Sequence, residues 1–333
     1  MTDHRTSPPA RRRAILGLAG AGLALPFVAR AQAAWPNRPL RFIVPLGPGG
    51  ATDIVMRLIA PRLQEKLGQP CVVENRVGAG GVVGTDYVTK QPPDGYTFVH
   101  CAVASAVIAE ALYPSLPYNP ERDLLPIAPT VFVPLTLSVT RRNLAVNSLA
   151  ELIAELRARP GQLSFASNGT GATSHLAGAN LLALTGTRAE HVPYRSGAEA
   201  LAALINGDVH FAFDIAGLHG PQHRDGRIHT IMVSPNRVSV MPDIPNNTEA
   251  GLPQLKAYSW FGIFGPTGVP EPIVQRLASV IGETMAEPAI RERLDTAGMP
   301  PMLDYTPARF AAFIREERAF WLPIVRASGA RVQ

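Results

Sequence analysis

The sequence predicts an α/β fold of two similar lobes joined by a hinge, with a ligand cleft between the lobes. From Pro39 onward, short β-rich runs alternate with helical patterns, which is typical of parallel strands connected by crossover helices. A long extended run with three prolines follows at 124–140, and the same alternation then starts again. A second extended segment near 252–262 and a helical C-terminal part indicate that the chain returns to its first half.

These crossovers also predict the domain bounds. We expect a first lobe of 36–134 and 256–333 and a second lobe of 135–255, after an N-terminal segment at 1–33 that belongs to neither. The chain has 333 residues, which is enough for two ordinary domains that each bury a core.

The first half is predicted to hold three strands and two helices. Pro61 lies within the first helix and predicts a kink there. The apolar face of that helix is expected to consist of Ile54, Val55, Leu58, Ile59, Leu63 and Leu67. The predicted strands are LRFIVPL (40–46), PCVVEN (70–75) and YTFVHCAV (96–103), and the predicted helices are 54–68 and 84–91.

The second half repeats this pattern. Ser148 and Glu151 have the spacing of a capping box at the start of its first helix. We expect strands at 162–167, 191–194, 209–213, 229–234 and 258–266, and helices at 148–161, 173–186, 197–207, 270–286, 288–297 and 306–322.

Residues 1–33 are predicted to be an export signal. Arg11–Arg13 precede the apolar run AILGLAGAGLALPFVA, which is too short and glycine-rich for a membrane-spanning helix. Arg12-Arg13 followed by Ala14 and Ile15 favours the twin-arginine route over the general secretory one. Cleavage is expected between Gln32 and Ala34.

The leader accounts for most of the positive charge. Residues 1–31 hold five of the 31 Lys and Arg residues and one of the 26 Asp and Glu residues, which leaves 26 basic and 25 acidic residues. No basic run with interleaved aromatic residues remains. The composition therefore argues against a nucleic-acid partner.

Cys71 and Cys101 are too few for a disulfide scaffold and lack the spacing of a zinc site. Each lies in a predicted buried strand, where a free cysteine behaves as a small hydrophobic residue. We predict two reduced, buried thiols, because cysteines on non-adjacent strands are usually too far apart to pair. A bridge in an oxidising compartment is the alternative.

Four loops that follow predicted strands carry the candidate ligand-binding residues, because ligands of open α/β sheets bind at the carboxyl ends of the strands. In the first loop, Gly49 and Gly50 allow a ligand close to the backbone, and Thr52 or Asp53 can cap the next helix. The free N–H groups and the positive end of the helix dipole suit a carboxylate or a phosphate. A tight turn without any ligand is the alternative.

The second loop, NRVGAGGVVGTDYV, resembles a dinucleotide-binding loop but does not match its fingerprint. Val83 stands where the third glycine of GxGxxG is required, and Gly84 comes one residue late. Backbone donors at a helix start are the simpler interpretation.

The third loop, SNGTGATSHL, begins at residue 167 and leads directly into a helix. Ser167, Asn168, Thr170 and Thr173 could donate to an anion together with the backbone. His175 lies within the helix, where we interpret it as a structural histidine in preference to a ligand contact.

The fourth loop begins at Asp214, at the end of the predicted strand 209–213. Its carboxylate could pair with an amine, accept from a hydroxyl group or a water, or cap the next turn. The chain has no G-x-S-x-G elbow, no phosphate-binding P-loop and no H-E-x-x-H. We therefore predict no catalytic residue, no metal site and no cofactor.

These loops, in this order, resemble the substrate-binding proteins of the tripartite tricarboxylate transporter family, the periplasmic Bug receptors. The similar segments include WPNRPLRFIVPLGPGGATDIVMR, PPDGYTF, PYNPERDLLPIA, SNGTGATSHLAG, HVPYRSGAEALAALINGDVHFAF, MPDIPNNTEAGLP and WFGIFGPTGVPEPIVQRL. They cover about residues 35–325. The resemblance implies a type II-like periplasmic binding protein fold and a monomer that closes on a small organic acid.

The resemblance also implies the binding residues, because the family holds carboxylates through backbone amides, short hydroxyl side chains and bridging waters. The implied residues are Gly49, Gly50, Ala51, Thr52 and Asp53 in the first lobe, and Ser167, Asn168, Thr170, Gly171, Thr173 and Asp214 in the second. Leu46 and Asn246-Asn247 depart from the family pattern, which bears on ligand size and hinge stiffness.

The resemblance implies that the protein acts in the periplasm and delivers the acid to membrane transporter subunits. Two alternatives stay open: a periplasmic sensor that presents the acid to a signalling partner, and an enzyme on the same scaffold. The sequence does not specify which carboxylate binds.

Overall fold

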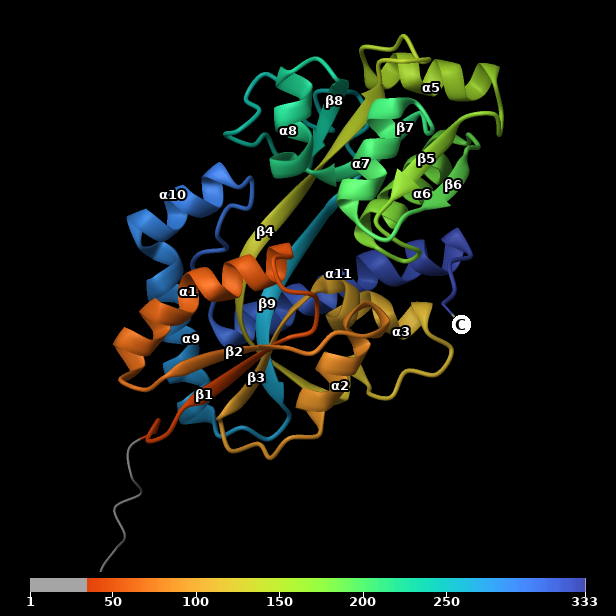
Figure 1. Cartoon of the computed structure of the whole chain (residues 1–333). Helices are drawn as coiled ribbons and strands as arrows, with labels where there is room; N and C mark the ends of the chain where they lie inside the picture. Colours follow the sequence, from red (N-terminus) through yellow and green to blue (C-terminus); the bar gives the residue numbers. More distant parts are fainter. Residues whose placement is uncertain (1–34, 333) are drawn as a thin grey trace, which may run out of the picture. The chain divides into compact units, whose positions relative to one another are not determined.

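The structure is a computed structural model that describes residues 35–332, and these belong to one compact unit. The predicted export signal at 1–33 lies outside the described residues. Two β-sheets, which share the long strand β4 (Leu124–Thr140), organise the described part of the chain (Figure 1). We call the elements around the first sheet lobe 1 and those around the second sheet lobe 2.

Each sheet combines parallel strands with the long strands that pass between the lobes. The first sheet has the order β2 (Cys71–Asn75), β1 (Leu40–Val44), β3 (Thr97–Ala102), β9 (Tyr258–Pro266) and β4. The second has the order β6 (Glu190–Pro193), β5 (Ser164–Ser167), β7 (Phe211–Ile215), β4 and β8 (Ile228–Ser234).

The sheets are mixed, whereas the sequence pattern predicted parallel strands. The pairs β1–β2, β1–β3, β5–β6 and β5–β7 are parallel, but β3–β9 and every pairing of β4 are antiparallel. The reason is that β4 carries the chain from lobe 1 to lobe 2 while β9 carries it back. The two strands therefore run in opposite directions, with Leu124 opposite Pro266 and Pro134 opposite Tyr258.

Among residues 35–332, the structure has the eight predicted α-helices and three additional α-helices, besides a 3-10 helix at Ala79–Gly81 and a π-helix at Ala104–Ile108. In lobe 1 the helices are α1 (Ala51–Leu67), α2 (Val82–Thr89), α3 (Ala109–Leu112), α4 (Pro120–Asp123), α9 (Glu271–Ala286), α10 (Pro288–Thr296) and α11 (Pro307–Ser328). In lobe 2 they are α5 (Leu149–Ala158), α6 (Thr173–Thr185), α7 (Gly197–Asn206) and α8 (Ala216–Arg224). The sequence did not predict α3, α4 or α8. α11 also continues through Pro323 to Ser328, six residues beyond its predicted end, because Val325 is still buried.

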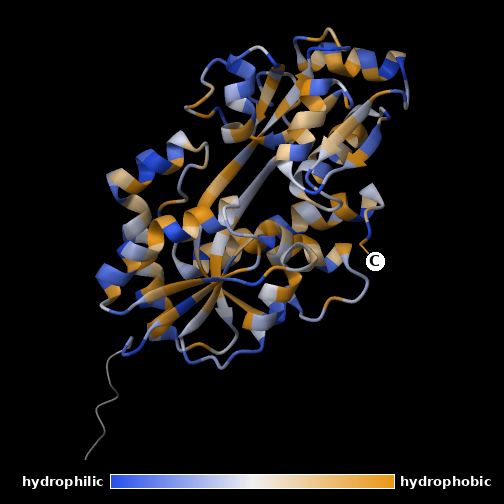
Figure 2. Cartoon of the chain, viewed as in Figure 1, coloured by the Kyte–Doolittle hydropathy of each residue, from blue (hydrophilic) through white to orange (hydrophobic). Residues whose placement is uncertain are grey.

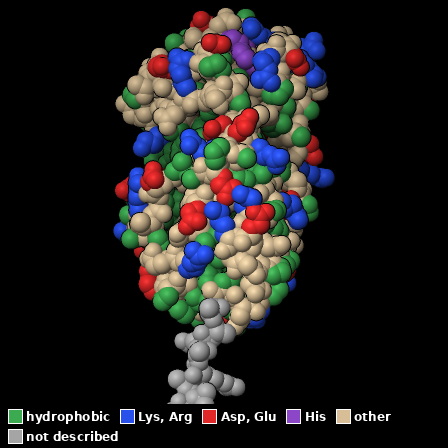
Figure 3. Space-filling view, turned by 90° about the vertical axis from the view of Figure 1, so that its left-hand side faces the viewer, with side chains coloured by type: hydrophobic (Ala, Val, Ile, Leu, Met, Phe, Trp, Pro, Cys, Tyr) green, Lys and Arg blue, Asp and Glu red, His purple; other side chains and the backbone are tan. Residues whose placement is uncertain are grey.

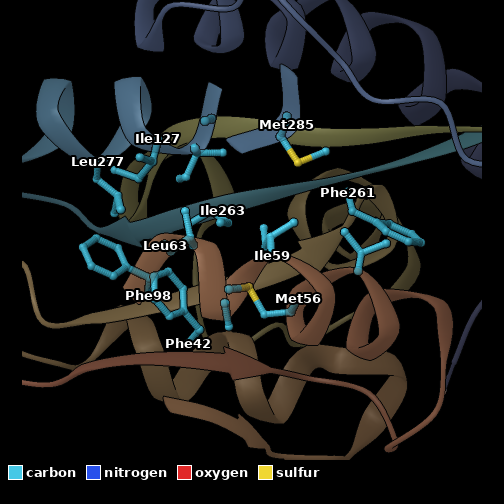
Figure 4. Close-up of a cluster of buried hydrophobic side chains, with 14 of the residues drawn as sticks. Phe42, Met56, Ile59, Leu63, Phe98, Ile127, Phe261, Ile263, Leu277 and Met285 are labelled. Atoms are coloured by element: carbon cyan, nitrogen blue, oxygen red, sulfur yellow. The ribbon is translucent and has the colours of Figure 1, made fainter. Parts of the chain in front are cut away.

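The core of lobe 1 lies between its sheet, α1 and α9. Figure 4 shows Met56, Ile59 and Leu63 of α1 among phenylalanines of the strands and Leu277 and Met285 of α9. The strands are mostly apolar, while the outer helices carry hydrophilic residues on their exposed sides (Figure 2). The predicted apolar face of α1 was wrong at one position, since Ile54 is 51% exposed.

The error at Ile54 has a simple geometric cause. α1 begins at Ala51, three residues before its predicted start, and its buried face continues toward the N-terminus through Thr52 and Asp53. Thr52 lies one helical turn before Met56, so it occupies the inward position that an apolar pattern would give to another residue.

The C-terminal helix α11 returns to lobe 1 and is fixed there by a buried carboxylate. Glu317 is 4% exposed and accepts hydrogen bonds from Tyr258, from Trp260 Nε1 (2.6 Å) and from Trp321 Nε1 (2.9 Å). Burial raises the pKa of Glu317, although these three donors favour its ionised form. Tyr258 and Trp260 belong to β9, so the helix is attached directly to a strand that passes between the lobes.

Both cysteines are free thiols, as predicted. Cys101 is buried in β3, but Cys71 is only half-buried at the start of β2, which corrects the prediction that both are buried. β1 separates the two strands. Strands two places apart in a sheet lie about 10 Å from each other, beyond the reach of a disulfide.

No helix within 35–332 has the length and apolarity needed to cross a bilayer. Figure 3 shows basic and acidic side chains intermixed over one face.

Candidate ligand-binding site

The predicted loops lie at the carboxyl ends of parallel strands in both sheets. The loop 45–50 follows β1 and leads into α1, while the loop 168–172 follows β5 and leads into α6. Asp214 is the last residue but one of β7, which lies next to β5. Open α/β sheets bind their ligands at this edge.

In lobe 1 the loop presents exposed backbone before an uncapped helix. Gly50 is the N-cap residue of α1 and has no side chain that could cap it. The first intrahelical bond runs from Ile54 N–H to Gly50 O (2.9 Å). The amides of Ala51, Thr52 and Asp53 thus precede that bond, and no acceptor for them occurs among residues 35–332.

Neither Thr52 nor Asp53 caps α1, which corrects that expectation. The Asp53 carboxylate is buried and accepts from Gly49 N–H (2.9 Å), Arg57 Nε (2.9 Å) and Asn75 Nδ2 (2.9 Å). Burial opposes ionisation of Asp53, but these donors outweigh it and lower its pKa. Asp53 therefore holds the glycine loop in place, and its carboxylate is already paired.

Thr52 contacts a buried histidine through its backbone carbonyl. Its carbonyl lies 3.0 Å from Nδ1 of His100, which must be the protonated ring nitrogen because a carbonyl only accepts. Nε2 of His100 lies 2.9 Å from Thr130 Oγ1 on β4. Thr52 Oγ1 is buried and has no partner among the described residues. The N–H group of Thr52 is likewise without an acceptor among residues 35–332.

The second loop, at 78–81, is the start of α2. Gly81 is the N-cap residue with a φ of 100°, and no side chain of the described residues caps the helix. This agrees with the interpretation of backbone donors at a helix start. Tyr113, at the C-terminal end of α3, donates from its Oη to the carbonyl of Ala79 (2.8 Å) and so attaches the loop to α3.

In lobe 2 the loop after β5 again leads into an uncapped helix. Ala172 is the N-cap residue of α6, and the first intrahelical bond runs from Leu176 N–H to Ala172 O (3.0 Å). The amides at 173–175 precede it and have no acceptor within 35–332. Asn168 and Thr170 are exposed.

Two predicted residues of this loop are held by histidines instead of facing outward. Ser167 is 1% exposed, and its Oγ lies 2.7 Å from His191 Nε2. The Gly171 N–H donates to His175 Nδ1 (3.0 Å). The interpretation of His175 as a structural histidine is confirmed. His191 was missed, although it begins the segment HVPY that carried part of the resemblance.

Asp214 is buried at the end of β7 and approaches the start of α7. Its Oδ1 accepts the N–H of Ile215 (2.8 Å), and its carbonyl accepts from Thr136 Oγ1 (2.9 Å). A Cβ atom added at Gly197 would lie 2.6 Å from Asp214 Oδ2, so only glycine admits the carboxylate there. Burial raises the pKa of Asp214 to about 6, against the effect of the Ile215 N–H.

Glycines also make contacts between the two lobes. A Cβ atom at Gly171 would lie 2.2 Å from Leu112 Cδ2 of α3, and one at Gly217 would lie 2.9 Å from the carbonyl of Ala297. Both glycines stand at helix starts of lobe 2. Sequence reasoning placed Gly171 in the site but gave no indication of its contact with Leu112.

Two surface hollows lie elsewhere. One of about 550 Å³ is lined by α10 and the segment at 239–240, and one of about 510 Å³ lies between α9 and 302–307. Neither is lined by a predicted site residue. In the part of the chain that the structure describes, no three His, Cys, Asp or Glu side chains are grouped to hold a metal ion.

Comparison with known proteins decides the family. The model described as "Tripartite tricarboxylate transporter family receptor" matches residues 55–330. The chain belongs to this receptor family. The receptor is 36% identical to Protein BugT of Bordetella pertussis, over 97% of this chain and 99% of the relative. The predicted family resemblance and the predicted fold class are thereby confirmed. The family consists of binding proteins, not enzymes.

Solved structures show the same fold. The receptor is similar to the R. palustris protein Rpa4515 with adipate, with a TM-score of 0.79 and 32% identity over 90% of this chain and 100% of that one. It is also similar to MatC from Rhodopseudomonas palustris with bound malate, with a TM-score of 0.76 and 31% identity over 87% and 99%. The periplasmic binding protein BugD gives a TM-score of 0.76 at 29% identity over 90% and 100%.

Proposed function

We propose that this receptor captures a small organic acid between its lobes in the periplasm and delivers it to membrane subunits of a tripartite tricarboxylate-type transporter. The observation that carries the proposal is the pair of uncapped helix starts, at α1 in lobe 1 and at α6 in lobe 2. Their N–H groups and dipoles favour a negative charge. Two relatives bind adipate and malate, which are dicarboxylates.

The proposed contacts divide by role. In lobe 1 the exposed glycines Gly49 and Gly50 allow close approach, and the amides at 51–53 donate. In lobe 2 the amides at 173–175 and the side chains of Asn168, Thr170 and Thr173 donate. Asp53, Ser167 and Gly171 keep the two loops in shape, because their polar groups are bonded within the protein.

Asp214 is proposed to form the floor of the site. Above about pH 6 its carboxylate is ionised and accepts from a hydroxyl, an ammonium group or a bridging water of the acid. Neither of the segments GPGGATD and SNGTGATS contains Lys or Arg. Affinity therefore comes from charge-assisted hydrogen bonds, each worth about 1.5–3 kcal/mol, without a salt bridge.

The proposed domain bounds remain 36–134 with 256–333 and 135–255. Closure about this hinge would bring both sets of donors onto one ligand, and the acid would favour the closed form because only that form offers both sets. Export by the twin-arginine signal, removal of 1–33 and a monomeric state complete the proposal.

A thermal-shift screen of an organic-acid library tests the function. An acid present at about 100 times its dissociation constant should stabilise the protein by about 2.7 kcal/mol. Isothermal calorimetry with the best acid should then give a stoichiometry of one per chain. If no mono-, di- or tricarboxylate shifts the melting temperature, the proposal is wrong.

A further inference from the structure

A stacked pair of histidines lies behind the loop 167–173. His175 of α6 and His191 of β6 have ring centroids 3.8 Å apart and ring planes 13° from parallel. Phe165 of β5 stacks against His191 at 4.9 Å, and Phe211 of β7 stacks against Phe165 at 5.4 Å. The pair is thus the end of an aromatic column that comes from the core of lobe 2.

Each histidine holds one end of the loop. The Gly171 N–H donates to His175 Nδ1 at 3.0 Å, and Ser167 Oγ lies 2.7 Å from His191 Nε2. Ser167 Oγ also accepts the Gly169 N–H at 3.2 Å, so its position sets the turn that follows β5. The two imidazoles therefore fix the backbone at both 167 and 171.

The chemistry requires His175 to be neutral. A backbone amide only donates, so Nδ1 of His175 carries no proton and the ring proton lies on Nε2. Burial lowers the pKa of both histidines to about 4. Two cations 3.8 Å apart in a buried site would also repel each other strongly, which keeps the pair uncharged at neutral pH.

Gly171 shows why the loop needs such a support. Its φ of 80° turns the backbone sharply, and it packs against Leu112 of lobe 1. Its buried N–H would be left without a partner if His175 Nδ1 were removed, and a buried unpaired amide is unfavourable. The loop would then rotate to find another acceptor and would carry the start of α6 with it.

We propose that His175 and His191 are positioning residues that set the loop 167–173 in the conformation in which the start of α6 receives the acid. This inference rests on the proposed function for its ligand but not for its geometry. The histidines do not contact the acid. They act through Gly171 and Ser167.

The geometry can be tested without a ligand. In the ¹⁵N-labelled protein, the Gly171 amide nitrogen and His175 Nδ1 should show a through-hydrogen-bond N–N coupling, and Nδ1 should have the chemical shift of an unprotonated ring nitrogen. The Gly171 amide should also exchange slowly with deuterium. Absence of the coupling, or a protonated Nδ1 at pH 7, would overturn the assignment even if acids bind well.

Matched variants test the effect on binding, with adipate and malate as probes measured by calorimetry. His175→Phe keeps the stack but removes the acceptor, whereas His175→Asn places an oxygen near the position of Nδ1. We expect His175→Phe to weaken binding of the tighter probe by roughly tenfold, the effect of losing about one hydrogen bond, and His175→Asn by under about threefold. His191→Phe and His191→Gln should behave as a second such pair.

The outcomes separate this inference from the proposed function. If His175→Phe and His191→Phe bind as tightly as the wild type while the fold is kept, the positioning role is wrong and the function stands. If the wild type binds neither probe nor any other acid, the function is wrong, and the coupling and exchange data still decide the loop geometry. If the Phe variants do not fold, equal losses in the Asn and Gln variants would likewise count against the inference.

Discussion

Some helices of this receptor are capped by the side chain of the N-cap residue, and others are not. At α7, Ser196 Oγ accepts the Glu199 N–H (3.2 Å), while Glu199 accepts the Arg195 N–H (3.1 Å). α5 has the same reciprocal arrangement, with Ser148 and Glu151, which confirms the predicted capping box. These two helices satisfy their first amides with their own side chains.

α1 retains only half of this arrangement. Asp53 accepts the N–H of Gly49, the residue just before the N-cap, as Glu151 and Glu199 do at the corresponding positions of α5 and α7. The N-cap itself is Gly50, where α5 and α7 have serine. At α6 the N-cap residue is Ala172, which also has no hydroxyl. The amides that a serine would satisfy are left free at the two helix starts that follow the central strands β1 and β5. A missing cap alone does not mark the site, because α2, α8, α9 and α10 also lack a side-chain cap. What sets α1 and α6 apart is that each follows a proposed binding loop at the carboxyl end of a parallel strand.

Acid should weaken the fold through histidines whose pKa is lowered by burial, and this is the largest effect we expect. Burial lowers the pKa of His100, His175 and His191 to about 4 and that of His219 to about 3. The unfolded chain therefore takes up protons first, so the free energy of unfolding should fall between pH 6.5 and pH 4. Each proton contributes about 1.4 kcal/mol per pH unit.

Asp214 acts in the opposite direction in the same range. Its pKa is raised to about 6, so the folded state is the one that binds this proton, and acid favours the fold at this group as it does at Glu317, whose pKa burial also raises. Four histidines against two carboxylates leave a net loss. Urea denaturation at pH 7, 5.5 and 4.5 measures this loss of unfolding free energy. A free energy of unfolding that stays constant or rises toward pH 4.5 would contradict the claim that these histidines are neutral in the folded protein.

Blocking the uncapped starts should remove acid binding. Gly50→Val places a branched side chain beside the free amides, and Thr170→Val removes a hydroxyl while keeping the shape. We expect each to weaken binding at least roughly tenfold, about 1.4 kcal/mol, in calorimetry. Arg195→Ala is the control, because it removes an exposed cation near α7. Loss of binding in Arg195→Ala with normal binding in both loop variants would favour a salt bridge instead.

Removing the cap of a helix outside the proposed site should lower the stability of the protein and leave its affinity for the acid unchanged. Ser148→Ala leaves the Glu151 N–H of α5 without its acceptor and should cost about 1 kcal/mol of stability. Acid affinity should stay within about twofold of the wild type, because α5 carries no proposed contact. A loss of affinity equal to that of Gly50→Val would show that any weakened helix start disturbs binding.

Adding the missing cap to α1 should produce the smallest but most specific effect. Gly50 has a φ of −71°, which serine also adopts, and Gly50→Ser would complete the capping box with Asp53. Stability should change by only a few tenths of a kcal/mol, since glycine is only slightly worse than serine at an N-cap and the added Cβ would lie 3.2 Å from the Gly47 carbonyl oxygen. Affinity should fall by about threefold, because the hydroxyl competes with the acid for the same amides. Tighter binding in Gly50→Ser would show that these amides are not used.

The long strands were the most predictable part of the fold. β4 and β9 have the bounds that their extended apolar runs indicated, 124–140 and 258–266. Their direction was less accessible, because periodicity reports which faces are buried and does not report strand pairing. The start of α1 was misplaced for a related reason. Thr52 and Asp53 are polar, and only tertiary partners such as Arg57 and Asn75 allow Asp53 to be buried.

The sequence predicted the backbone loops of the candidate site but not the side chains that hold these loops in place. Glycine-rich segments directly before helices predicted the two loops of the candidate site, and the structure places both at the carboxyl ends of parallel strands. The supports come from distant positions: His191 reaches Ser167 from 24 residues away, and His100 reaches Thr52 from 48 residues away. No local pattern encodes these contacts.

The most direct test of the account follows the backbone amides during acid binding. In a ¹⁵N–¹H titration with the acid selected by the thermal-shift screen, the amide protons of 51–53 and 173–175 should shift strongly downfield as they become charge-assisted donors. The amides of Glu151 and Glu199, which their serine caps already satisfy, should hardly move. Large shifts confined to 149–151 or to the surroundings of Arg195, with 51–53 and 173–175 unchanged, would contradict the claim that the two uncapped helix starts hold the acid.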